Sequence, residues 1–81
     1  MGSASIVFSY SSDPLVLAAL KEFRVFPVDD GLNRLTSPVV VPPDSIPTSS
    51  NPLTVPMPPS ATQIEVVPVD MDGYEGEAAY I

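Results

Sequence analysis

The stretch from Pro38 to Pro59 most constrains how this 81-residue chain can fold. It contains eight of the 11 prolines, no glycine, no aromatic residue and one charged residue, Asp44. Each proline fixes its own φ at about −65°, removes a backbone donor and disfavours helix in the residue before it. A helix interior or a central strand is therefore excluded here, and we expect an extended backbone.

The side chains of this stretch distinguish it from a flexible linker. Linkers are rich in glycine, serine and charge and poor in aliphatic residues. This stretch instead carries a series of aliphatic side chains: Val39, Val40, Val41, Ile46, Leu53, Val55 and Met57. We therefore favour a strap whose aliphatic residues lie on a protein surface, either its own or that of a partner. A solvated linker is the alternative.

The residues before the strap read as a small β-α-β unit. Ser3–Tyr10 alternates larger and smaller side chains, which predicts a half-buried strand. Asp13-Pro14 is a helix start, and Leu15–Glu22 continues with helix-forming residues whose apolar side chains wrap most of the circumference. We expect this helix to be well buried, in the chain's own core rather than against a partner. Phe23–Val28 reads as an extended strand, and Pro27 predicts that it is either an edge strand or a short one.

Turn and strand patterns continue on both sides of the strap. Asp29-Asp30-Gly31 predicts a turn in which Gly31 takes positive φ. Ala61–Val69 alternates as a strand, and Pro68 predicts that the strand lies at an edge or ends there. Residues 70–77 form an acidic turn and loop. The chain ends on Ala78–Ile81, whose apolar side chains suggest that the tail is docked.

The predicted fold class is therefore mostly β and irregular with one short N-terminal helix. It divides into a small β-α-β-like N-terminal unit (1–36), an extended proline-rich strap (37–60), and an edge strand with an acidic C-terminal tail (61–81). With no disulfide, a chain of this size has only a marginal core of its own.

Charge and residue types exclude most chemistry. The net charge is −7, and residues 35–81 contain six acidic residues and no basic one, which disfavours direct nucleic-acid binding. The chain has no histidine and no cysteine, so we expect no enzyme activity and no cofactor. Asp70-x-Asp72 resembles the start of a calcium loop, but Glu75 stands where an EF-hand requires glycine, so we expect no metal.

The sequence also bears on location. No secretory signal and no membrane span are expected, since the N-terminus lacks a basic region and no aliphatic run is long enough. We therefore expect the protein in a virion or in the cytoplasm.

Three functions remain in competition. The first is a non-enzymatic structural accessory subunit that binds in extended form across the subunits of a large assembly. In build such a chain resembles the small cement, decoration and minor capsid proteins of viruses and bacteriophages. The second is an acidic inhibitor or nucleic-acid mimic that uses its negative C-terminal half against a basic groove. The third is an autonomous small domain that presents the proline-rich stretch to a recognition module.

We favour the first function, with partners that are protein subunits, such as a capsid protein, and with no membrane and no free monomer. The expected partner-binding residues are aliphatic or aromatic and come from the strap, the last strand and the C-terminus: Val39, Val40, Val41, Ile46, Leu53, Val55, Ile64, Val66, Tyr80 and Ile81. On this hypothesis, replacing Val40 or Val55 by aspartate weakens incorporation into the assembly without unfolding the N-terminal unit.

Overall fold

The computed structural model describes residues 2–81 of the chain. It is mostly β-strand with one short α-helix, as the sequence predicts. The elements in chain order are β1 (Gly2–Ile6), α1 (Pro14–Ala19), β2 (Leu20–Val28), β3 (Val39–Val41), the 3₁₀ helix η1 (Pro43–Ser45), β4 (Leu53–Met57), β5 (Gln63–Asp70) and β6 (Ala79–Tyr80).

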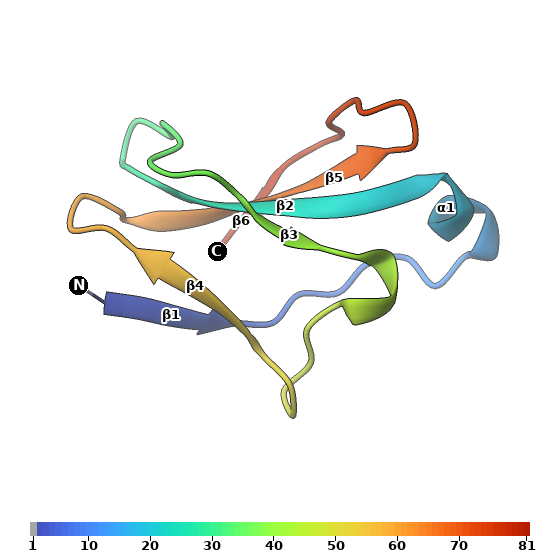
Figure 1. Ribbon diagram of the computed structural model, residues 1–81, viewed down its shortest axis with the longest axis horizontal. Helices are drawn as coiled ribbons and strands as arrows, with labels where there is room; N and C mark the ends of the chain where they lie inside the picture. Colours follow the sequence, from blue (N-terminus) through green and yellow to red (C-terminus); the bar gives the residue numbers. More distant parts are fainter. Residues whose placement is uncertain (1) are drawn as a thin grey trace.

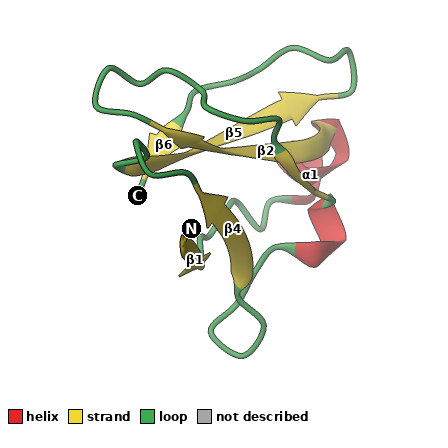
Figure 2. Cartoon of the chain, turned by 60° about the vertical axis from the view of Figure 1, so that its left-hand side comes forward, coloured by secondary structure: helices red, strands yellow, loops and turns green. Residues whose placement is uncertain are grey.

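The strands form two antiparallel sheets in two layers (Figures 1 and 2). The larger sheet has the order β3-β2-β5-β6, and the smaller is a ribbon of β1 and β4. The helix α1 lies at one end of the molecule, directly before β2 (Figure 1). Every strand pair is antiparallel, and the two longest strands, β2 and β5, form the centre of the larger sheet.

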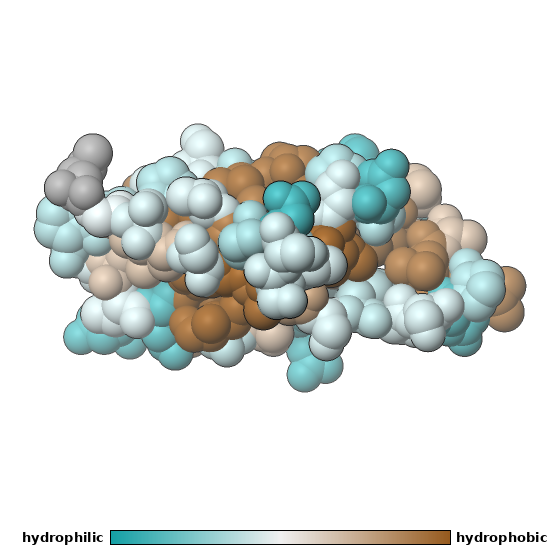
Figure 3. Space-filling model, turned by 90° about the horizontal axis from the view of Figure 1, so that it is seen from below, coloured by the Kyte–Doolittle hydropathy of each residue, from teal (hydrophilic) through white to brown (hydrophobic). Residues whose placement is uncertain are grey.

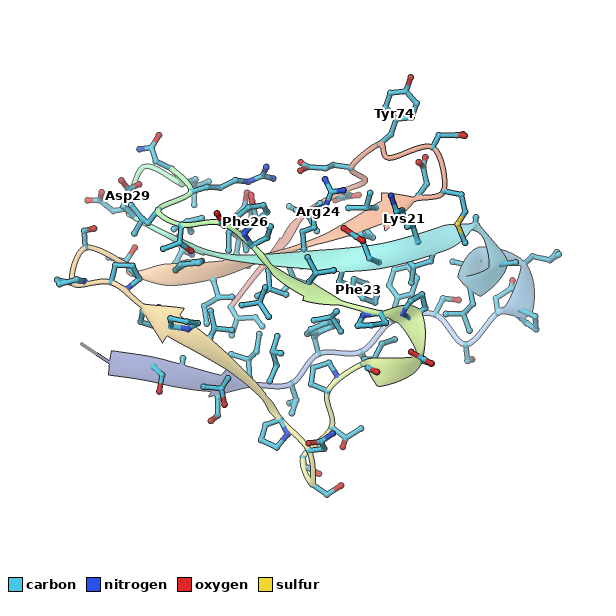
Figure 4. The ribbon with its side chains drawn as sticks, in the orientation of Figure 1. Lys21, Phe23, Arg24, Phe26, Asp29 and Tyr74 are labelled. Carbon is cyan, nitrogen blue, oxygen red and sulfur yellow. The ribbon has the colours of Figure 1, made fainter. Side chains whose placement is uncertain are left out.

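The hydrophobic core lies between the two layers. Strand alternation directs every second side chain of β2 and β5 toward the ribbon, and Phe23 points into this space (Figure 4). The core residues come from both sheets and from the start of β2: Ile6, Leu20, Phe23, Val25, Val41, Val55, Ile64 and Val66. The strands on both sides of the proline-rich stretch therefore share one core.

The β-α-β unit expected in residues 1–36 does not form. β1 pairs with β4, with Ala4 opposite Val55, whereas β2 lies in the other sheet. Residues from all three predicted segments pair with one another, so the segments belong to one fold. The physical reason is that β1 and β2 each bury their apolar face by packing across the layers.

The helix α1 is shorter and more exposed than expected. Asp13 caps it by accepting a hydrogen bond from the Leu15 amide at 2.9 Å, as the sequence predicts. It ends at Ala19, because Leu20 already has extended backbone angles and begins β2. None of its residues is buried, and Leu15 is 82% exposed, so the prediction of a well-buried helix was wrong.

Pro27 and Pro68 lie in the two long central strands, although the sequence predicted an edge strand or a short one at Pro27 and an edge strand or a strand end at Pro68. The carbonyl of Pro27 accepts a hydrogen bond from Leu35, and that of Pro68 accepts one from Gly76. A residue's amide nitrogen and carbonyl point to the same side of a strand, so both prolines direct their missing donor away from the β2–β5 ladder. The central ladder thus keeps its hydrogen bonds.

The proline-rich stretch folds as two short strands rather than one continuous extension. β3 pairs with β2, and β4 pairs with β1. The turn of η1 and a tight turn closed by Thr48 and Asn51 join them. Val41 and Val55 belong to the chain's own core, so this stretch ties the two sheets together.

The turns that follow β2 and β5 have the same construction. In the first, the Asp29 carboxylate accepts hydrogen bonds from the amides of Gly31 and Asn33, each at 2.9 Å. In the second, Asp70 accepts from the amides of Asp72 and Tyr74, again at 2.9 Å. In both, the amide of the residue three positions after the aspartate donates to the aspartate carbonyl at 3.0 Å.

That third residue has positive φ in both turns: 62° at Leu32 and 89° at Gly73. A type I turn followed by a left-handed residue is a common short connection between antiparallel strands, and it favours glycine at the left-handed position. Gly73 meets this requirement. In the first turn the sequence predicted positive φ at Gly31, whereas the structure places it one residue later, at Leu32.

The two turns belong to a longer internal repeat. Val25-Phe26-Pro27-Val28-Asp29 corresponds to Val66-Val67-Pro68-Val69-Asp70, 41 positions later. Val25 is paired with Val66, and on either side of that pair Phe23 is opposite Pro68 and Pro27 is opposite Ile64. This register relates β2 and β5 by a local twofold axis through the Val25–Val66 pair.

Candidate binding surface

A groove of about 350 Å³ opens at the end of the molecule where α1 meets the turn after β5. One side consists of residues from the segment before β2, and the other consists of the end of β5 and the loop that follows it. The lining residues are Tyr10, Val16, Ala19, Leu20, Pro68, Val69, Asp70, Tyr74, Glu75 and Gly76. A smaller hollow of about 120 Å³ adjoins it and shares Tyr10 and Pro68.

Aromatic packing fixes the first side of the groove. The ring of Tyr10 meets the ring of Phe23 edge-on, with centroids 5.0 Å apart, and Phe8 makes a similar contact with Phe23 at 5.0 Å. β1 ends at Ile6, four residues before the end of the predicted strand. The alternation still places Ile6, Phe8 and Tyr10 toward the larger sheet. The irregular segment that follows β1 can therefore form one side of the groove.

The turn after β5 forms the opposite side. The Met71 amide donates to the carbonyl of Ala19 at 3.2 Å, which fastens this turn to the end of α1. Tyr74 points away from the sheet (Figure 4) and is 72% exposed. The Asp70 carboxylate already accepts two backbone amides, so it stabilises the turn. Within residues 2–81, no group of three or more acidic side chains is placed to hold a metal ion.

Large exposed apolar side chains concentrate around this groove. Of the ten that are exposed in residues 2–81, Tyr10, Val16 and Tyr74 line it, and Leu15 and Met71 are sequence neighbours of lining residues. Leu15 and Met71 are 82% and 63% exposed. Exposed apolar side chains gathered around a groove are typical of protein interaction sites.

A charged cluster lies on the face of the larger sheet that is remote from the ribbon. Arg34 donates through Nε to Glu65 at 2.7 Å and, through both terminal nitrogens, to Glu75 at 2.7 and 2.9 Å. Its guanidinium group lies 4.0 Å from the centroid of the Phe26 ring. Glu65, which is only 6% exposed, also accepts a hydrogen bond from Tyr80 at 2.7 Å.

This cluster joins the two repeated turns. Arg34 and Glu75 occupy equivalent positions, since Arg34 bridges to Val28 and Glu75 bridges to Val69. The local twofold axis relates these two positions, and their opposite charges form a paired contact across it. The cluster also fixes Glu75, which lines the groove.

The ion pairs shift three pKa values. The hydrogen bonds with Glu75 raise the pKa of Arg34, and those same bonds lower the pKa of Glu75. The hydrogen bond to Glu65 raises the pKa of Tyr80 above its usual value. Arg34 and Glu75 therefore keep their opposite charges at neutral pH.

The structure separates the ten residues that the sequence predicted for partner binding. Val41, Val55, Ile64 and Val66 lie in the chain's own core, and Val39, Ile46 and Leu53 pack against it half-buried. Val40, Tyr80 and Ile81 are exposed, by 51%, 41% and 52%. Val40 lies on β3 and the other two lie at β6, so the sheet separates these exposed residues rather than gathering them.

The groove was missed in the sequence. Its residues come from separated segments: Tyr10 was assigned to a half-buried strand, Val16, Ala19 and Leu20 to a buried helix, and Tyr74 to an acidic loop. The exposed Leu15, Val16 and Tyr74 can be recognised only once α1 is seen to lie at the end of the molecule.

Comparison of the chain with known protein families, with characterised proteins and with solved structures finds no significant match. In the described part of the chain, no helix is long and apolar enough to cross a membrane.

Proposed function

We propose that this protein is a non-enzymatic accessory subunit that binds another protein component of a large assembly, such as the coat of a virion. The observation that supports this is the set of exposed apolar side chains that line the groove, Tyr10, Val16 and Tyr74, with the exposed Leu15 and Met71 beside them in the sequence. An apolar groove with aromatic and aliphatic residues at its rim suits an inserted aliphatic or aromatic side chain of a partner protein.

The proline-rich strap has a narrower part in this proposal than the sequence alone suggested. Its residues Val41 and Val55 stabilise the fold, which leaves Val40 as its most exposed valine. We propose that Val40, together with Tyr80 and Ile81, forms secondary contacts with neighbouring subunits, while the groove provides the main contact.

The acidic-inhibitor alternative receives less support from the charges. Glu65 and Glu75 are paired with Arg34, and Asp29 and Asp70 accept backbone amides within their own turns. Asp13 caps α1 and Glu22 pairs with Arg24, so six of the ten acidic side chains are used internally. A mimic of nucleic acid requires a dense row of free negative charge.

The test is to follow the protein in extracts of its natural source. The wild-type protein should sediment with a large assembly, and Tyr74→Asp and Leu15→Asp should each move it to the free fraction, with affinity lowered roughly tenfold or more. Ser49→Asp, in the exposed turn between η1 and β4, is the matched control and should remain bound. Wild-type protein found free and monomeric, or Tyr74→Asp that remains bound, would argue against the proposal.

A further inference from the structure

The four strands with an open edge are not equally protected. In residues 2–81, β1 pairs only with β4, while β3 and β6 lie at the two ends of the larger sheet. An open edge presents unpaired backbone donors and acceptors, and native proteins block such edges with proline, charge, or very short strands. Where that protection is missing, another strand can add.

Three of these edges are protected. Pro38 and Pro42 flank β3, and β4 contains Pro56. β6 has only two residues. Each of these edges offers too few consecutive donors and acceptors to accept a further strand.

β1 has none of this protection. It is five residues long, contains no proline, and has no charged side chain anywhere from Gly2 to Ser12. Its small residues Gly2, Ser3, Ala4 and Ser5 allow another strand to approach closely. Seen from the β1 side of the molecule, apolar surface lies among hydrophilic residues (Figure 3).

We propose that β1 pairs antiparallel with β1 of a second copy of this chain, so that two ribbons join into one four-stranded sheet of order β4-β1-β1-β4. Two identical strands that pair antiparallel about a twofold axis form a closed, self-complementary interface. All ten acidic residues lie from Asp13 onward, so this contact brings no carboxylate against another along the strand, although each chain carries a net charge of −7.

The same geometry limits growth to a dimer. The outer strands of the joined sheet are the two copies of β4, and each carries Pro56 within the strand and Pro52 and Pro58 beside it. A further strand cannot pair regularly with such an edge. In the dimer, the β1 edge of each chain is therefore already paired, and no unprotected edge remains.

The side chains that test this pairing are Ser3 and Ser5. Ile6 lies in the core and Ala4 packs against it, so the alternating residues Ser3 and Ser5 lie on the outer, exposed face. In an antiparallel pair of two β1 strands, outer-face residues of one copy lie opposite outer-face residues of the other. Changes at these positions act on the contact and leave the core intact.

Sedimentation equilibrium of the purified full chain should show a reversible monomer–dimer equilibrium. Ser3→Lys/Ser5→Lys and Ser3→Glu/Ser5→Glu should each weaken dimerisation at least about tenfold, because like charges then face each other across the strands. A mixture of the two variants should recover a dimer that contains one chain of each kind. Ser5→Lys should weaken dimerisation more than Thr54→Lys, which places the same charge on β4 opposite Ser5.

A second measurement does not depend on variants. Amide hydrogen exchange of Gly2–Ile6 should slow as the protein concentration rises, while exchange in β4 should not change. The proposal is overturned if the wild-type chain stays monomeric at all concentrations, if the Lys variant dimerises as well as the wild type, or if open-ended polymers form. The proposed function concerns a different partner, which binds at the groove. A dimer can therefore be found although the proposed function fails, and the proposed function can hold although no dimer is found.

Discussion

Arg34 connects two turns that are 41 residues apart in the chain. Its two terminal nitrogens both donate hydrogen bonds to the Glu75 carboxylate, and its Nε donates to the buried Glu65. Planar two-bond pairs between arginine and carboxylates are among the stronger ion pairs, and this one also stacks on an aromatic ring. Among the three basic residues of the chain, only Arg34 lies at the turn position where the local twofold brings a carboxylate.

Replacing Arg34 by methionine should destabilise the fold by about 2–3 kcal/mol, because Glu65 would keep a buried charge without its ionic partner. The pair is partly exposed, so the expected loss lies below that of a fully buried one. Urea unfolding followed by circular dichroism measures this difference. The double variant Arg34→Met/Glu65→Gln should recover part of the lost stability. If it recovers none, the loss comes from removing the contacts of Arg34 and not from leaving the Glu65 carboxylate without its partner.

The same pair predicts how stability depends on pH. Arg34 lowers the folded-state pKa of Glu75, so this interaction contributes stability that is fully present above the unfolded pKa and is lost as the pH falls through the lower folded pKa. Between about pH 4.5 and pH 2, the free energy of unfolding should therefore fall less steeply in Glu75→Gln than in the wild type. Equal slopes in urea titrations over this range would contradict the assignment.

Leu32 holds a backbone conformation that its side chain disfavours. Its φ of 62° costs a non-glycine residue about 1–2 kcal/mol, and asparagine tolerates it better. Leu32→Asn should raise the melting temperature by roughly 4–8 °C, since a gain of about 1 kcal/mol has this effect in a chain of this size. The equivalent position is the control: Gly73→Leu should lower the melting temperature. A Cβ at Gly73 meets no atom within 4 Å, so that effect would come from the backbone alone.

At the scale of elements, the proline-rich stretch contains one valine that supports the fold and one that does not. Val55 is fully buried between the layers, whereas Val40 is 51% exposed on the opposite face of the larger sheet. Val55→Asp should leave the chain unfolded, because an unpaired charge would enter the core. Val40→Asp should change stability by less than about 0.5 kcal/mol. Far-ultraviolet circular dichroism of the two proteins gives the comparison, and a folded Val55→Asp variant would contradict this assignment of the core.

That pair also shows what the sequence could and could not predict. Side-chain alternation predicted strands where β1, β2 and β5 lie, and Asp13-Pro14 predicted the start of α1. Both are local properties of the chain. Strand pairing and burial are not local, so the sequence did not reveal that Val41 and Val55 fill the core between two sheets. Because Val55 lies in the core, Val55→Asp is now expected to unfold the chain rather than to spare the N-terminal unit.

The two prolines in the central strands show a related difficulty. A proline excludes one hydrogen bond, but whether this matters depends on which side of the strand its nitrogen faces. The sequence contained one clue to that side: the repeated Pro-Val-Asp at Pro27 and Pro68. Had the repeat been recognised, a matching pair of strands that each end in the same turn would have been predicted, with both prolines turned outward. Predicting that the groove is exposed would still have required knowledge of where α1 lies.

At the scale of the whole molecule, the two halves of the chain are interleaved. Each half contributes one strand to the ribbon and two to the larger sheet, and the main ladders, β1 with β4 and β2 with β5, join one half to the other. The radius of gyration is 12.6 Å, close to the roughly 12 Å expected for a compact domain of this length. Each half has only one strand of the ribbon, so neither has a complete second layer on which to bury the apolar face of its two sheet strands.

We therefore expect that the chain folds only as a whole. When it is divided between Ser49 and Ser50, in the exposed turn before β4, the fragments 1–49 and 50–81 should each be disordered, because each lacks its partners in both ladders. Mixed in equal amounts, they should regain the circular dichroism spectrum of the intact chain, which itself should unfold in one cooperative transition. A cooperative transition in fragment 1–49 alone would instead mean that the N-terminal half is an independent unit, and that the contacts across the local twofold axis add to a fold already formed.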